Sequence, residues 1–155
     1  MARSRRREIG RRVRESPTRR YGEDPEAPAA EGVLLDTDVL IDVLRGEPRT
    51  TATLRDLEQR GVPLHYTAIT VAEVYAGLRA FEAVAVEEFF ATRREVVLDH
   101  VAGRRAGAYL ARYATSHGVR IADALIAAAA STTGLTLWSA NRKHFPMRDV
   151  RLLER

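Results

Sequence analysis

Residues 33–42 constrain the fold most, because three apolar residues, Val33 to Leu35, end in a carboxylate and an apolar helical pattern begins at once. A short apolar run of this kind predicts a buried parallel strand, and ligands of open α/β sheets bind beyond the carboxyl ends of such strands. Asp36 would stand in that crevice. Asp also caps helices, so this segment alone is equally compatible with a cap and with a catalytic group.

Two later segments also place an acid near the start of a predicted helix. Glu73 follows a predicted strand at residues 63–66, and Asp123 begins a very apolar helix at residues 121–130. Each has a structural alternative: Thr70 and Glu73 match a capping box, and Asp123 would complement a helix dipole. Together these alternatives are less favoured, because a helix this apolar has to be buried, and its start would bury the acid unless a cation met it.

A fourth segment, a predicted strand at residues 135–138, ends in polar residues that include Ser139 and Asn141. Strands alternating with helices predict an α/β sandwich around a central parallel sheet, with right-handed crossovers. In such a sheet the three acids and Asn141 can converge at one edge.

The remaining segments are predicted to be scaffold. We expect Phe89 and Phe90 to be core or subunit contacts rather than a platform for stacking bases. The expected elements are helices at residues 50–60, 82–94 and 102–117 and a strand at residues 96–98.

These stretches resemble a known family in their order and spacing. Residues 33–42, 70–78, 121–130 and 139–145 are similar to the four signature stretches of PIN-domain ribonucleases, specifically the VapC-type toxins of bacterial type II toxin–antitoxin pairs. Each motif alone is weak, whereas four in the right order are specific. The resemblance implies a PIN domain at residues 33–155 with a three-layer sandwich, an RNA substrate, a small cognate antitoxin as partner, and a homodimer.

The resemblance also implies roles for individual residues. Ser139 falls where the family more often has Thr, and Asn141 where it has Asn or Asp. His144 occupies a place that is Asp in some members, which leaves one carboxylate fewer for a second metal ion. The residues that match the family's acidic metal-binding positions are Asp36, Glu73 and Asp123.

The chemistry of such a cluster points the same way. Carboxylates in a tight pocket raise one another's pKa, so the cluster calls for a multivalent cation. The chain has no Cys and no paired-His spacing such as HExxH, so Mg²⁺, or Mn²⁺, is favoured over zinc. Such a metal lets a bound water attack a phosphodiester in line, which here implies endonucleolytic cleavage of RNA. We expect Asp36 and Asp123 to be ligands, Glu73 a ligand or water-orienting base, and Ser139 and Asn141 supporting polar groups.

Two further acids follow Asp36 in the same helix. Asp42 lies four residues beyond Asp38 on one helical face, so a solvated face, or a face paired with Arg45, is expected for both.

Composition is compatible with one ordinary domain. A chain of 155 residues can bury a real core, and the absence of Cys excludes disulfides and thiol catalysis. No segment is long and uncharged enough to span a membrane, and the Arg-rich start lacks the apolar stretch of a secretory signal. We therefore expect a cytoplasmic protein.

Positive charge is concentrated at the start of the chain. Residues 1–20 hold nine Arg against Glu8 and Glu15, a net charge of +7, whereas the whole chain carries +4. Residues 1–32 have almost no large apolar side chain, so we expect a flexible arm. It can be a solvated tail, an electrostatic clamp for RNA, or upstream sequence included by a misplaced start, which we favour.

Two other classes of function compete with the nuclease. Asp36 and Asp38 have the spacing of the acidic pair in aspartyl-phosphate phosphatases and receiver domains, but those need a well-placed Lys and the only Lys is Lys143. The second alternative is a non-catalytic PIN-like RNA-binding module, against which the retention of all three acids argues. An assay of metal-dependent cleavage separates the three classes.

Overall fold

A parallel sheet of four strands forms the centre of the molecule. The computed structural model describes residues 31–154, so residues 1–30 of the predicted arm lie outside the described residues. The strands have the order β3-β2-β1-β4. They are β1 (Val33–Leu35), β2 (Leu64–Thr67), β3 (Arg94–Val96) and β4 (Thr136–Trp138).

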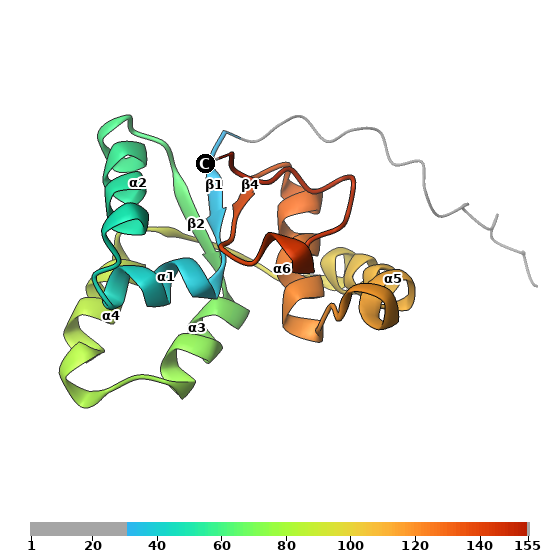
Figure 1. Ribbon diagram of the computed structural model, residues 1–155, viewed down its shortest axis with the longest axis horizontal. Coiled ribbons are helices and arrows are strands. Elements are labelled where there is room, and N and C mark those ends of the chain that lie inside the picture. Colours follow the sequence, from blue (N-terminus) through green and yellow to red (C-terminus); the bar gives the residue numbers. More distant parts are fainter. Residues whose placement is uncertain (1–30, 155) are drawn as a thin grey trace, which may run out of the picture.

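The sheet is covered by helices on both faces. Helices α1 to α4 lie on one side and α5 and α6 on the other, so the predicted three-layer sandwich is confirmed (Figure 1). The helices are α1 (Thr37–Leu44), α2 (Pro48–Gln59), α3 (Ala68–Ala76), α4 (Ala83–Ala91), α5 (His100–His117) and α6 (Ile121–Thr133), with short 3-10 turns η1 (Ala80–Glu82) and η2 (Arg142–His144). None of the helices within residues 31–154 has the length and apolar character needed to cross a membrane.

The central strand β1 is apolar because both of its faces are buried. Leu34 belongs to the core beneath α5 and α6, whereas Val33 and Leu35 belong to the core beneath α1 to α4. All three side chains are at most 4% exposed. Alternate residues of one strand therefore anchor two different helix layers, which explains the unbroken apolar run in the sequence.

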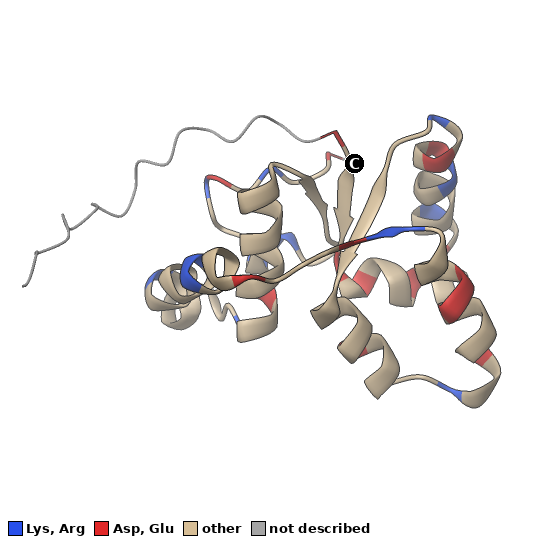
Figure 2. Ribbon diagram, turned by 180° about the vertical axis from the view of Figure 1, so that it is seen from behind, with Lys and Arg blue, Asp and Glu red and all other residues tan. Residues whose placement is uncertain are grey.

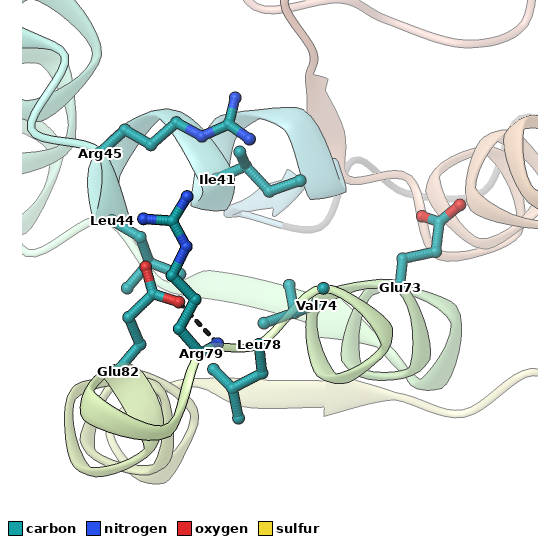
Figure 3. Close-up of a pocket in the computed structure, with 9 residues that line it drawn as sticks. Ile41, Leu44, Arg45, Glu73, Val74, Leu78, Arg79 and Glu82 are labelled. Carbon is teal, nitrogen blue, oxygen red and sulfur yellow. Dashed lines mark hydrogen bonds between the residues drawn. The ribbon is translucent and has the colours of Figure 1, made fainter.

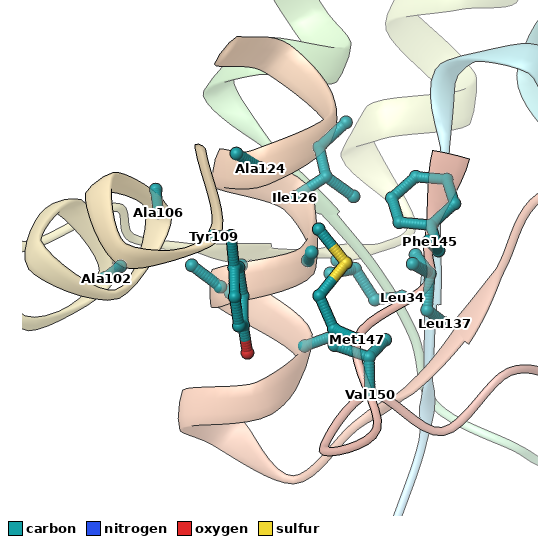
Figure 4. Packing of buried hydrophobic residues seen from close by; sticks show 14 of the residues in the cluster. Leu34, Ala102, Ala106, Tyr109, Ala124, Ile126, Leu137, Phe145, Met147 and Val150 are labelled. Atoms are coloured by element: carbon teal, nitrogen blue, oxygen red, sulfur yellow. The ribbon is translucent and has the colours of Figure 1, made fainter. Parts of the chain in front are cut away.

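The core on the α5–α6 side is built from small residues on the helices and larger ones on the strands. The alanines of α6 let it lie close to the sheet, where Ile126 packs with Leu34 and Leu137 (Figure 4). Helix α5 ends at Gly118, whose φ of 66° is in the left-handed region that favours glycine. The turn there leads directly into α6, so the two helices form one layer.

Element boundaries differ from the predictions by a few residues. The third strand begins at Arg94 instead of residue 96, because β3 pairs with β2 from His65↔Arg94 onward. Phe89 and Phe90 are each 8% exposed, as expected for core residues.

Candidate active site

Asp36 directly follows the central strand β1, beside the end of its neighbour β4. Its backbone N–H donates to the carbonyl of Trp138 at 2.9 Å, so the pairing of β1 with β4 continues to this residue. Its carboxylate Oδ1 accepts from the N–H of Thr37 at 2.8 Å, which makes Asp36 the N-cap of α1. The residue is only 7% exposed. The capping role is therefore observed, and it leaves the buried carboxylate at the end of the sheet, where a catalytic group was predicted.

Asp38, the second residue of α1, contacts the turn that follows β4. Its Oδ2 accepts from Ser139 Oγ at 3.2 Å and from the backbone N–H groups of Ala140 and Asn141 at 2.9 and 3.0 Å. The expectation of a solvated or Arg45-paired face is therefore wrong for Asp38. Its other oxygen, Oδ1, is buried and has no hydrogen-bond partner among the described residues.

The carboxyl of Asp36 is strongly affected by these surroundings. Burial, followed by the charge of Asp38 and more weakly that of Asp123, raises the pKa of Asp36 from 3.8 to about 7, against hydrogen bonds from Ser139 and Thr37 that act in the opposite direction. Acids from the first turns of α1 and α6 thus both act on the carboxyl of Asp36. Figure 2 shows acidic segments of the ribbon on α1 at this end of the sheet.

Glu73 joins the site from α3. Thr67, not Thr70, is the N-cap of α3, since the Thr67 side chain accepts from the N–H of Thr70. The structural alternative, a capping box formed by Thr70 and Glu73, is therefore not realised, and Glu73 lies in the second turn of the helix. Its Oε2 accepts a short hydrogen bond from Thr37 Oγ1, which links α3 to the first residue of α1.

Asp123 enters from the first turn of α6. Its Oδ2 accepts from the N–H of Arg120 at 2.9 Å, so the acid does cap its helix, and it lies 3.5 Å from His144 Nδ1. The same His144 nitrogen lies 2.9 Å from Asn141 Nδ2. No role for His144 was predicted from the sequence. The signal that indicates one is its place three residues after Asn141, because residues i and i+3 eclipse on a 3-10 turn.

The arrangement of these acids bears on metal binding. Within residues 31–154, no three His, Asp or Glu side chains lie close enough together, as they stand, to hold a metal ion. Glu73 and Asp123 are turned to the local donors described above. A buried carboxylate oxygen without a donor is costly unless a positive charge offsets it, and Asp38 Oδ1 is such an atom beside Asp36. An all-oxygen set of this kind suits a hard divalent cation.

A hollow of about 130 Å³ lies between α1, α3 and η1, next to Glu73 (Figure 3). Its walls combine apolar side chains with both signs of charge. They are formed by Ile41, Leu44, Arg45, Glu73, Val74, Gly77, Leu78, Arg79 and Glu82.

The chain is similar to known proteins of one family. The profile of the PIN domain family matches residues 33–150. The chain is 35% identical over 115 residues to Ribonuclease VapC19 of Mycobacterium tuberculosis, which covers 74% of this chain and 92% of the relative. It is 37% identical over 116 residues to Ribonuclease VapC10 of the same organism, which covers 74% and 86%.

Solved structures show the same fold. DNA-bound VapBC from Salmonella typhimurium superposes with a TM-score of 0.67 at 23% identity, over 80% of this chain and 98% of that one. FitAcB from Neisseria gonorrhoeae superposes with a TM-score of 0.59 at 28% identity, over 79% and 96%. The chain therefore belongs to the PIN domain family and, within it, to the VapC proteins.

Proposed function

We propose that the protein is an endoribonuclease that depends on Mg²⁺ or Mn²⁺ and is the toxin of a type II toxin–antitoxin pair. The observation that carries this is the buried Asp36 at the end of the central strand, with Asp38 and Asp123 in electrostatic reach of it. A carboxyl whose pKa is raised to about 7 gains more from a nearby cation than an ordinary surface carboxyl does. The two relatives named above are both ribonucleases by name.

In this proposal Asp36 and Asp123 hold the cation. When bound, it would supply the positive charge that polarises the scissile phosphate and offsets the charge developing on it. Glu73, exposed on α3 with its carboxylate held by Thr37 Oγ1, orients the attacking water and accepts its proton. Ser139 and Asn141 support the site, since both belong to the turn that Asp38 contacts.

Incubation of purified protein with total RNA tests the activity. We expect new 5′ ends to appear with Mg²⁺ or Mn²⁺ and to be absent with EDTA, and Asp123→Asn to remove cleavage while the fold survives. Asp56→Asn, an exposed acid on α2 paired with Arg60, is the matched control and should cleave as the parent does.

The competing classes give different results in the same experiment. An aspartyl-phosphate phosphatase would release phosphate from small esters and leave RNA intact. An RNA-binding module would shift RNA in a gel and cut nothing. Either outcome, with protein shown to be folded, would overturn the nuclease proposal.

We also propose a small antitoxin partner, because a toxic nuclease has to be silenced in its own cell. The Salmonella neighbour is a VapBC assembly bound to DNA. The hollow beside Glu73 offers apolar walls for a partner segment, from which an Arg can reach the acidic site as a match for carboxylates. Co-expression with the small protein encoded next to this one should restore growth and yield a complex.

A charge reversal in the hollow tests that surface. Arg79→Glu, in the wall of the hollow, should weaken the complex, whereas Arg148→Glu, an exposed residue outside it, should not. Equal binding by both variants would place the partner elsewhere. The expected homodimer is tested by light scattering of the purified toxin.

A further inference from the structure

One carboxylate of α1 carries three contacts to a segment about a hundred residues further along the chain. Oδ2 of Asp38 accepts from Ser139 Oγ and from the N–H groups of Ala140 and Asn141. These donors are consecutive, so the turn between β4 and η2 wraps one oxygen atom. Hydrogen bonds to an ionised acceptor are stronger than those to a neutral one. Three of them on one oxygen atom fix the position of the turn relative to α1.

The turn at residues 139–141 contains Ser139 and Asn141 of the candidate site and contacts Asp38 and His144. Ser139, which is 3% exposed, also accepts from the N–H of Asn141 at 3.0 Å. The side chain of Asn141 contacts His144, and His144 lies beside Asp123. A continuous series of contacts thus runs from Asp38 on α1 to Asp123 on α6.

A merely local role does not account for Asp38. An acid in the first turn of a helix is favoured by the helix dipole, but for this a solvated side chain is sufficient. Ala140 is exposed, and its N–H would be satisfied by water if Asp38 were absent. The bond to Asp38 therefore selects one conformation of the turn among several that water would tolerate.

We propose that Asp38 is a positioning residue: through Oδ2 it locks the turn at residues 139–141 onto α1, and so sets where Asn141 and His144 stand relative to Asp36 and Asp123. Its effect on cleavage rests on the proposed ribonuclease function. Its effect on the turn does not.

Amide hydrogen exchange followed by NMR tests the structural part. In Asp38→Ala we expect the N–H of Ala140, which donates to Asp38 Oδ2, to exchange at least about tenfold faster than in the parent. The N–H of Asn141 also donates to Ser139 Oγ, so its exchange should rise less. Because Ala140 is exposed, burial alone would not slow its exchange in the parent. The N–H of Asp36, which donates to Trp138, should stay protected and so report that the sheet is intact.

Two further variants make the test specific to the carboxylate's position. Asp38→Asn keeps an acceptor oxygen at the same reach, so the protection of both amides should return to within about threefold of the parent. Asp42→Ala, one turn later on α1 and facing Thr50, is the matched control and should leave both amides unchanged. If Asp38→Ala does not fold, Asp38→Ser, whose side chain is too short to reach the turn, replaces it. Unchanged exchange in Ala140 and Asn141 for a folded variant, or the same loss in Asp38→Asn, overturns the proposal.

Kinetics test the functional part. Misplaced catalytic groups lower kcat and leave RNA binding nearly intact, so Asp38→Ala should lose at least about tenfold in kcat with KM within about threefold, and Asp38→Asn should recover part of kcat. A change confined to KM would assign Asp38 to RNA binding and refute positioning. If the parent itself cuts no RNA, the proposed function has failed, while the exchange experiment still decides whether Asp38 fixes the turn.

Discussion

Replacing Asp36 by Asn should stabilise the metal-free protein while it removes the activity. Asn caps helices as well as Asp does, and its carbonyl oxygen can accept the bond that Thr37 N–H now donates. The substitution therefore leaves the start of α1 intact. What it removes is a carboxylate that burial and Asp38 make costly to ionise.

The magnitude follows from proton linkage. The pKa of Asp36 rises from 3.8 to about 7 on folding, so between these pH values the folded state holds a proton that the unfolded state has lost. The contribution of Asp36 to the free energy of unfolding is fully present below its pKa in the unfolded state, and it declines as the pH rises through its pKa in the folded state. Each unit corresponds to about 1.4 kcal/mol, so the folded protein loses up to about 4 kcal/mol between pH 4 and pH 7. Asp36→Asn should remove that loss.

Urea unfolding of parent and variant in EDTA, from pH 4.5 to pH 8, measures the effect. The two free energies of unfolding should converge at the acidic end and diverge toward neutral pH, with the variant the more stable. Asp56→Asn should follow the parent throughout. Parallel curves for parent and Asp36→Asn would refute the reasoning. Added Mg²⁺ at a hundred times its dissociation constant should stabilise the parent by about 2.7 kcal/mol and the variant by much less.

Three further outcomes are expected. Leu34→Ala truncates a fully buried side chain of the central strand and should lower the free energy of unfolding in urea by about 3 kcal/mol. The sheet is packed between two helix layers, so the cavity can close only a little. Asp149→Ala should lower the free energy of unfolding by about 2 kcal/mol, because Asp149 Oδ2 accepts from Arg105, Tyr109 and Ser131. Burial and Asp149 raise the pKa of Tyr109 to about 12, so in this variant Tyr109 should titrate at lower pH in a spectrophotometric titration. A protein that begins at Val33 should unfold at the same urea concentration as the full chain, and a lower midpoint would contradict the domain boundary. If the protein without residues 1–32 cleaves RNA faster at low salt, the arm is autoinhibitory; if it cleaves more slowly, the arm is an RNA clamp.

Much of the architecture followed from local rules. An apolar run that ends in Asp36 predicts a strand buried on both faces, and β1 is such a strand. The apolar character of residues 121–130 likewise predicted a buried helix, and Ala127 to Ala129 are fully buried in α6. A hydrophobic pattern indicates which residues are buried. It therefore predicts the presence of a strand or helix better than the residue at which that element begins or ends, as the shifted start of β3 illustrates.

Only the tertiary structure decided which polar groups meet. Asp38 and Asp42 share a helix face in the sequence pattern, yet only Asp38 reaches the turn after β4, because the register of β1 against β4 brings that turn to the start of α1. Because Thr67 is the N-cap of α3, the carboxylate of Glu73 does not cap its own helix and accepts from Thr37 Oγ1. A sequence pattern records the environment of each residue and not its partner, and a hydrogen bond between residues a hundred positions apart depends on strand register and helix packing, which arise only when the whole chain folds.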